Sequence, residues 1–319
     1  MRFLITGGAG FIGSHLSEEL ISRGHEVVAL DNLSTGSLKN ITALSQNSNF
    51  EFIQGNIRNQ ELVARLVQDS DGVFHLAAAV GVQQILDNPI ESLQTNIQGT
   101  ENVLFSASKY EKRVLLASTS EIYGKNDSEP LKEESNRILG SPLLSRWTYS
   151  EAKAIDESIA RTLFESRGLK VQIVRLFNTV GPKQSPAYGM VIPRFFSAAM
   201  KNTPLQIYGD GLQKRVFCHV SDAISGIIDL WDSNSGFGEA FNLGGFEEVS
   251  IVDLASRIVE LTHSSSNFEF VSYEKMAVVG FEDIRRRIPV TSKLTDLTGW
   301  RPKLGLSEIL EDIYLKLLK

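Results

Sequence analysis

The chain has 319 residues, 42% of them hydrophobic, and a formal net charge of −6 from 32 basic and 38 acidic side chains. This length suits about two domains, and the weak acidity without a long single-sign run argues against nucleic acid or an anionic membrane as the main partner. No stretch reaches the roughly 18 apolar residues of a membrane span. The single cysteine, Cys218, excludes an intrachain disulfide, so we expect a cytoplasmic protein.

The first predicted strand, residues 2–6, leads into a glycine-rich turn and a predicted helix over 11–23. Glycines let the backbone approach a dinucleotide pyrophosphate closely, and the free N–H groups of the helix start hold its negative charge. The next predicted strand, 26–30, is followed by Asp31, near the roughly 20-residue offset of an acid that binds ribose hydroxyls. A carboxylate there repels a 2′-phosphate, which favours NAD over NADP. The predicted cofactor residues of this segment are Gly7, Gly10, Phe11, Ile12, Gly13, Asp31 and Asn32.

Further along the chain, apolar runs of strand length alternate with segments of helical spacing. The strand-like runs lie at 50–54, 72–76, 113–118 and 171–176, and the helical segments at 59–68, 91–110 and 150–167. Such alternation is typical of an α/β fold with a doubly wound parallel (Rossmann) sheet. We therefore predict an NAD-binding domain over residues 1–177.

From about residue 178 the pattern loosens, and prolines and the turn at 208–211 interrupt it. We predict a smaller mixed α/β lobe over 178–319 that mainly binds the substrate, with room for segments that return to the Rossmann sheet. Its helices are expected at 191–201, 221–232, 250–262 and 306–318. The ligand cleft should lie between the two parts, at the carboxyl ends of the strands.

Hydroxyl groups and one carboxylate, in the run Ser118 to Gly124, follow the predicted strand 113–118. Further on, Tyr149 and Lys153 are spaced i, i+4 and share one face of a predicted helix. A tyrosine of pKa near 10 is a poor base at neutral pH, but a nearby ammonium and a nicotinamide ring would lower that pKa. We predict that Tyr149 is the base, that Lys153 holds the nicotinamide ribose, and that Thr119 shares the hydrogen bond of the substrate hydroxyl.

The chain resembles the extended short-chain dehydrogenase/reductase family, and within it the nucleotide-sugar epimerases, dehydratases and decarboxylases. The resemblance is nearly full-length. It lies in the motifs Thr6 to Gly13, His75 to Ala78, Asn96 to Thr100, Tyr149 to Lys153, Arg175 to Pro182 and Tyr208 to Gly211.

This resemblance implies a bound NAD that is regenerated, with Tyr149 removing the proton of the sugar 4-hydroxyl and a 4-keto sugar forming. It also implies a homodimer built on the helices 91–110 and 150–167. Many relatives carry Gly-Asp near the adenine where this chain has Gly55-Asn56, and an asparagine still offers an acceptor. By the same resemblance the cofactor is also contacted by Asn56, Ile57, Ala77, Ala78 and Asn96, and the nucleotide sugar by Asn178, Tyr208, Arg215 and Arg287.

The residues after the strand 113–118 distinguish the possible reactions. The 4,6-dehydratases have Thr-Asp-Glu there, the 4-epimerases generally lack both carboxylates, and the UDP-glucuronate decarboxylases resemble Thr119-Ser120-Glu121 with an arginine that matches Arg215. We therefore predict a UDP-glucuronate decarboxylase-like enzyme in which Ser120, Glu121 and Arg215 position the carboxylate and protonate C5. The alternatives are a 4-epimerase of UDP-glucose or UDP-glucuronate, a 4,6- or 5,6-dehydratase, and a module that binds NAD without turnover.

The remaining histidines and the cysteine have simpler interpretations. The five histidines lack paired ligand spacing, so no metal site is expected. We expect His75 to be a hydrogen-bonded core residue, and Cys218, within an apolar run, to be buried and unreactive.

Overall fold

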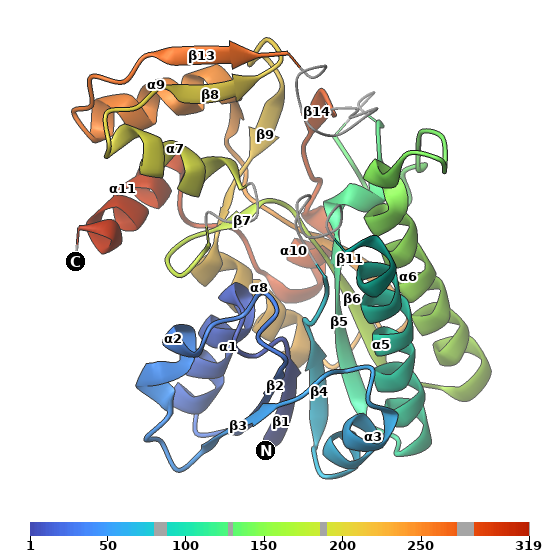
Figure 1. Ribbon diagram of the computed structural model, residues 1–319. Helices are drawn as coiled ribbons and strands as arrows, with labels where there is room; N and C mark the ends of the chain where they lie inside the picture. The colour runs from blue at the N-terminus through green and yellow to red at the C-terminus, as the bar shows by residue number, and fades with distance from the viewer. Residues whose placement is uncertain (80–87, 127–129, 186–189, 273–283, 319) are drawn as a thin grey trace.

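A seven-stranded parallel sheet forms the larger of two lobes (Figure 1). The computed structural model describes residues 1–79, 88–126, 130–185, 190–272 and 284–318. The strand order is β11-β6-β5-β4-β1-β2-β3. The strands are β1 (Arg2–Thr6), β2 (Glu26–Asp31), β3 (Phe50–Gln54), β4 (Gly72–His75), β5 (Arg113–Thr119), β6 (Val171–Leu176) and β11 (Ala240–Leu243).

Helices cover both faces of this sheet. One face packs against α1 (Phe11–Ser22) and α8 (Val220–Asp232), and the other against α3 (Gln60–Gln68), α5 (Pro89–Lys109) and α6 (Thr148–Arg167). Strands covered on both faces are apolar throughout, and β1 and β4 show this with Phe3, Leu4, Val73 and Phe74 all at most 1% exposed. Short segments follow β2 and β5 and precede α6, namely α2 (Leu38–Ile41), η1 (Thr42–Leu44), η2 (Ser120–Tyr123) and η3 (Ser145–Trp147).

The smaller lobe, at the top of Figure 1, lies beyond the carboxyl ends of the sheet. It contains the three-stranded sheet β12-β9-β14 and the pairs β13-β8 and β10-β7. Its apolar core is built by α7, α9 and α11. The elements are β7 (Thr179–Val180), α7 (Val191–Ala199), β8 (Leu205–Tyr208), β9 (Lys214–Val216), β10 (Cys218–His219), β12 (Glu248–Ser250), α9 (Ile251–Leu261), β13 (Phe268–Val271), β14 (Arg286–Arg287) and α11 (Leu306–Leu317). The helix α10 (Ser292–Thr298) instead packs against α8 and β11 of the larger lobe.

The predicted α/β fold with a doubly wound parallel sheet is confirmed, and the sheet crosses the boundary predicted at residue 177. Its seventh strand, β11, pairs with β6 in parallel, although it lies far into the second half of the chain. The helix α8 joins the core of the sheet through Ile227 and Trp231. Asn242 interrupts the apolar run of β11 after two residues, so the sequence does not mark this segment as a core strand.

Two residues have the buried positions that the sequence predicts. His75 is 1% exposed and its ring bonds the hydroxyls of Thr6 at 2.6 Å and Thr100 at 3.0 Å. Burial lowers the pKa of His75 to about 3, so the ring is neutral. Cys218 is 1% exposed, and burial raises the pKa of its thiol. In the described ranges, no helix combines the length and apolarity needed to cross a membrane.

We predict that Trp231→Ala lowers the free energy of unfolding by about 3 to 5 kcal/mol, the usual cost of removing a buried tryptophan. Its ring lies 5.4 Å from Phe3 and 4.7 Å from Phe74 between centroids, so α8 is anchored to the sheet at this point. Urea denaturation measures the change, with Leu143→Ala, at a site 92% exposed, as the control. A loss below about 1 kcal/mol would mean that α8 contributes little to the core of the larger lobe.

Candidate functional site

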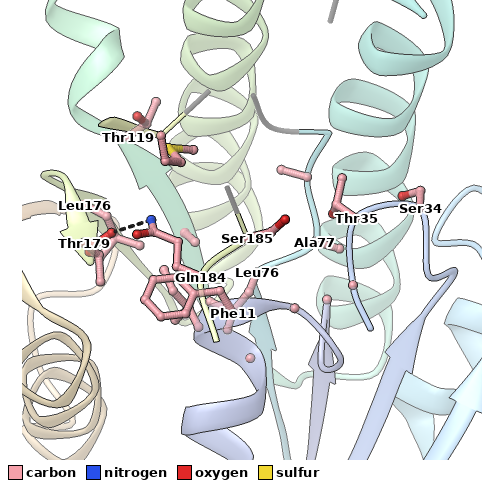
Figure 2. Close-up of a pocket in the computed structure, with 18 of the residues that line it drawn as sticks. Phe11, Ser34, Thr35, Leu76, Ala77, Thr119, Leu176, Thr179, Gln184 and Ser185 are labelled. Carbon is pink, nitrogen blue, oxygen red and sulfur yellow. Dashed lines mark hydrogen bonds between the residues drawn. The ribbon is translucent and has the colours of Figure 1, made fainter. Parts of the chain in front are cut away.

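A cavity of about 1010 Å³ lies at the carboxyl edge of the large sheet and is lined by residues of both lobes. Ligand pockets in proteins have volumes of about 300 to 1,000 Å³, so this cavity lies at the upper end of that range. Figure 2 shows Phe11 and Leu76, from the sheet side of the cavity, close to Thr179 of β7 and to Gln184. The Gln184 side chain donates to the carbonyl oxygen of Thr179 at 3.1 Å.

The glycine turn leaves no room for side chains. Gly7 has φ +72°, and a Cβ there would lie 2.9 Å from the Ala77 nitrogen. A Cβ on Gly13 would lie 2.2 Å from the Gly7 carbonyl oxygen. The helix α1 starts after Gly10 without a side-chain cap, so its first N–H groups can bind an anion. This cradle fits a dinucleotide pyrophosphate.

Asp31, at the end of β2, is held by the backbone of two loops. Its Oδ2 accepts the N–H of Ala9 at 3.0 Å and its Oδ1 the N–H of Leu33 at 2.8 Å. The side chain is 8% exposed, and burial raises the pKa of Asp31 while these N–H groups lower it. Asn32 stabilises the same loop, because its Oδ1 accepts the N–H of Ser34 at 3.1 Å. A carboxylate fixed at the cavity wall fits ribose hydroxyls.

Tyr149 and Lys153 are one turn apart on α6, and both line the cavity. A hydrogen bond joins the side chains of Tyr149 and Thr119. The ammonium of Lys153 is almost fully buried, donates to the Ala117 carbonyl at 3.1 Å, and lies 3.2 Å from an Asp156 oxygen.

In the protein without ligands the pKa of Tyr149 is raised, and the lowering expected from Lys153 together with a bound nicotinamide ring stays a prediction. Burial raises this pKa, and the charges of Glu121 and Asp156 raise it further, while the hydrogen bond with Thr119 opposes them. The physical reason is that the charge of Lys153 is balanced by Asp156. Tyr149 is therefore a neutral phenol before ligands bind.

Glu121 lies between two guanidinium groups. Its Oε2 is 2.6 Å from Arg146 Nη2, and its Oε1 pairs with Arg287 Nη1. Arg287 Nη2 also donates to Asn178 Oδ1 at 3.3 Å. Although burial opposes ionisation, the two arginines lower the pKa of Glu121 to about 2. The side chain is thus ionised in the protein without ligands, and the expected part of Glu121 in protonating C5 stays a prediction.

Most of the residues predicted from the sequence line this one cavity. From the cofactor group these are Gly7, Gly10, Phe11, Ile12, Gly13, Asp31, Asn32, Ile57, Ala77, Ala78, Tyr149 and Lys153. From the catalytic and substrate groups they are Thr119, Ser120, Glu121, Asn178, Arg215 and Arg287. The structure thus brings together segments from almost the whole chain, and their individual roles stay predictions.

Three predicted contact residues do not line the cavity. The Oδ1 of Asn56 accepts the N–H of Arg58 at 2.9 Å, so this side chain stabilises its own turn. Asn96 is buried and bonds the backbone of Ala79 at 2.7 Å and 3.3 Å, which supports the cavity wall from behind. Tyr208 ends β8, with the Arg194 guanidinium 4.3 Å from its ring centroid. The contacts expected of these three with cofactor or substrate stay predictions.

The prediction from sequence missed several cavity residues, of which Arg146 lies nearest to the catalytic tyrosine in the chain. Lys183 is another, and its ammonium bonds Glu18 at 2.7 Å and the carbonyl of Asn40 at 2.9 Å. The signal for Arg146 was its place three residues before Tyr149, since a cation so close to the base must lie near the reacting end of the cavity. In the described residues, no three His, Cys, Asp or Glu side chains gather as metal ligands would.

Comparison with known proteins identifies the family. The family model for GDP-mannose 4,6 dehydratase matches residues 4–313. The chain belongs to this family. The chain is 41% identical to the UDP-N-acetyl-α-D-glucosaminuronate decarboxylase of Bacillus cytotoxicus, with 98% of this chain and 96% of that protein covered. It is 37% identical to UDP-glucuronic acid decarboxylase 1 of Xenopus tropicalis, with 96% and 70% covered.

Solved structures agree with this assignment. The UDP-glucuronic acid 4-epimerase of Bacillus cereus, in complex with UDP-glucuronic acid and NAD, matches with a TM-score of 0.90 at 30% identity, covering 100% of this chain and 99% of that one. A dTDP-glucose 4,6-dehydratase of Streptomyces venezuelae with NAD bound gives 0.89 at 29%, covering 100% and 97%. The predicted resemblance, the enzyme class and the NAD dependence of that class are thereby confirmed.

We predict that Asp31→Ala weakens NAD binding by about 1 to 3 kcal/mol, because charged hydrogen bonds are lost. NADH is titrated into the NAD-free protein, and its fluorescence measures the affinity for the cofactor. The matched control is Asp232→Ala, whose side chain is 63% exposed. Unchanged affinity, or a wild-type preference for NADP, would contradict the assignment of Asp31 to the ribose.

We predict that Tyr149→Phe reduces turnover at least about 100-fold, the usual loss when a general base is removed. The variant should fold and retain NAD, because the phenol hydroxyl bonds only Thr119 among the described side chains. Steady-state kinetics and the NAD released on denaturation report both properties. Near-normal turnover would show that Tyr149 is structural.

Proposed function

We propose that the chain is an NAD-dependent decarboxylase of a UDP-hexuronate. The observation that carries the proposal is the cluster of Glu121 with Arg146 and Arg287, which lines the cavity beside Tyr149 and has one more positive than negative charge. A buried excess cation favours a substrate that brings a carboxylate. The similarity to two kinds of hexuronate decarboxylase supports the same substrate class.

In this proposal the glycine turn and Asp31 hold the pyrophosphate and ribose of NAD, and Lys153 holds the second ribose. When bound, NAD supplies the acceptor for the hydride of sugar C4. The positive nicotinamide ring and Lys153 would favour the phenolate of Tyr149 once NAD is bound. That phenolate would remove the proton of the C4 hydroxyl, and Thr119 would share the hydrogen bond of that hydroxyl. The products of this step are a C4 ketone and a protonated tyrosine.

The C4 ketone makes the C5 carboxylate a β-keto acid. When the bond between C5 and the carboxyl carbon breaks, its electron pair moves toward the ketone and carbon dioxide leaves. C5 then takes a proton that comes from solvent. Arg287 orients the carboxylate, because its guanidinium matches the geometry of a carboxylate. Glu121 pairs with both Arg146 and Arg287 before the substrate binds, so we assign it the role of holding these arginines in place.

A second candidate is 4-epimerisation of UDP-glucuronate. It is favoured by the epimerase of Bacillus cereus, which matches over the full chain and is solved with UDP-glucuronic acid bound. An epimerase leaves C5 untouched, so it needs Tyr149, Thr119 and Lys153 but no help to the leaving carboxylate. Dehydration is less supported, because Ser120 stands where the dehydratases carry an aspartate.

We also propose a cytoplasmic homodimer that forms through α5 and α6. A groove runs along these helices and is lined by residues that include Phe105, Ile155 and Ile159. Phe105 and Ile155 are each 44% exposed, which is unusual for apolar side chains of a helix pair that stays uncovered. Light scattering of the purified protein tests the dimer.

We predict that the NAD-loaded enzyme releases carbon dioxide from UDP-glucuronate, UDP-N-acetylglucosaminuronate or both. Arg287→Met should reduce release about 10- to 100-fold or more, because charged hydrogen bonds to the substrate are lost. Arg285→Met is the matched control, two residues away on a side chain 62% exposed. Carbon dioxide capture and NMR of the nucleotide sugar measure the reaction.

The same NMR spectra separate the alternatives. A C4 epimer without carbon dioxide, and without solvent deuterium at C5, would overturn decarboxylation in favour of epimerisation. Loss of water from the sugar would instead identify a dehydratase.

A further inference from the structure

Arg146 has a fixed position beside the catalytic tyrosine. It belongs to η3, the turn that leads directly into α6, and lies three residues before Tyr149. Its side chain is only 11% exposed, and its guanidinium carbon is 5.1 Å from the ring centroid of the fully buried Trp147. Burial and packing on Trp147 therefore fix the position of this guanidinium near the reacting end of the cavity.

The two arginines of the cluster come from different parts of the fold. Glu121 and Arg146 both belong to the larger lobe, whereas Arg287 comes from β14 of the smaller lobe. Each carboxylate oxygen of Glu121 has its own guanidinium, since Oε2 contacts Arg146 and Oε1 contacts Arg287. Glu121 can thus lose one partner and still keep the other.

A substrate carboxylate changes the charge balance of this cluster. Before the substrate binds, the carboxylate of Glu121 faces two guanidinium groups. When the substrate carboxylate is added, the cluster has two positive and two negative charges. If Arg287 turns to the substrate, Glu121 stays buried and needs another cation, because an unpaired buried charge costs several kcal/mol. Among the described residues, Arg146 already pairs with the other oxygen of Glu121.

We propose that Arg146 is a positioning residue that keeps Glu121 paired when Arg287 exchanges Glu121 for the carboxylate of the substrate. The inference rests on the proposed function, because it requires a substrate with a carboxylate. The two arginines then have distinct roles, since Arg146 holds the protein's own carboxylate and Arg287 holds the incoming one.

The ionisation of Glu121 agrees with this division. The charged and titratable groups that face it are Arg146 from η3, Arg287 from β14 and the phenol of Tyr149 from α6. The two arginines lower the pKa of Glu121 to about 2. Without Arg146, transfer of Arg287 to a substrate would leave Glu121 with the neutral phenol, and its pKa would rise because burial favours the protonated acid.

The test compares UDP-glucuronate with UDP-glucose, which lacks the carboxylate, on the NAD-loaded protein. A Tyr149→Phe background prevents turnover, so calorimetry measures binding alone. Arg146→Met should weaken UDP-glucuronate about 10- to 100-fold and leave UDP-glucose nearly unchanged. Binding of UDP-glucuronate to this variant should also take up a proton, seen by comparing buffers of different ionisation enthalpy, and should recover at lower pH.

Three further variants make the result specific. Glu121→Gln combined with Arg146→Met should restore the preference for UDP-glucuronate, because the carboxylate that needs a partner is gone. Arg146→Lys should retain most of the preference for UDP-glucuronate. Lys125→Met, which removes a cation 5.9 Å from the ring of the same Trp147, is the matched control and should behave as wild type.

Equal weakening of both ligands, absence of proton uptake, or failure of the double variant to restore the preference would show that Arg146 is only structural. A wild-type protein that does not prefer UDP-glucuronate would also overturn the inference. The proposed function is tested separately: it fails when the unmodified enzyme epimerises UDP-glucuronate without releasing carbon dioxide. In that case the ratio of the affinities for UDP-glucuronate and UDP-glucose still tests the role of Arg146.

Discussion

The parallel arrangement of the large sheet is the constraint on which the site depends. Because all seven strands run in one direction, their carboxyl ends meet at one edge. The glycine turn follows β1, Asp31 ends β2, and Thr119 ends β5, so residues distant in sequence line one cavity. The smaller lobe closes that edge and brings arginines to it. The direction of the strands thus decides which residues meet at the cavity, and the local motifs decide which side chains they bring.

Charge balance is the second organising feature, and it is handled differently at the two ends of the cavity. Asp31 accepts uncharged backbone N–H groups, which leave its negative charge uncompensated at the cavity wall. Glu121 is paired with two cations, which leave a net positive charge that favours an anion. Tyr149 lies near this cluster and stays protonated until its surroundings change. Two acidic side chains therefore prepare two sites of different preference.

Much of the architecture could be predicted from the sequence, because β1 to β6 are largely apolar and alternate with amphipathic helices. The bounds of β2 and β6 differ from the prediction by at most one residue. Tertiary pairing of short segments could not be predicted: β11 is four residues long and joins the sheet only through β6. The ion pair between Glu121 and Arg287 was equally hidden, since it joins residues 166 apart in the chain.

The pairing of β14 with β9 has a consequence for the stability of the smaller lobe. Arg287 is the register partner of Arg215, so two guanidinium groups of like charge stand on neighbouring strands at the cavity. Like charges on adjacent strands oppose sheet formation, and a bound polyanion relieves that repulsion. Ligand occupancy and the folding of this small sheet are therefore thermodynamically linked. The small sheet that carries Arg215 and Arg287 should therefore be most rigid when a polyanion is bound in the cavity.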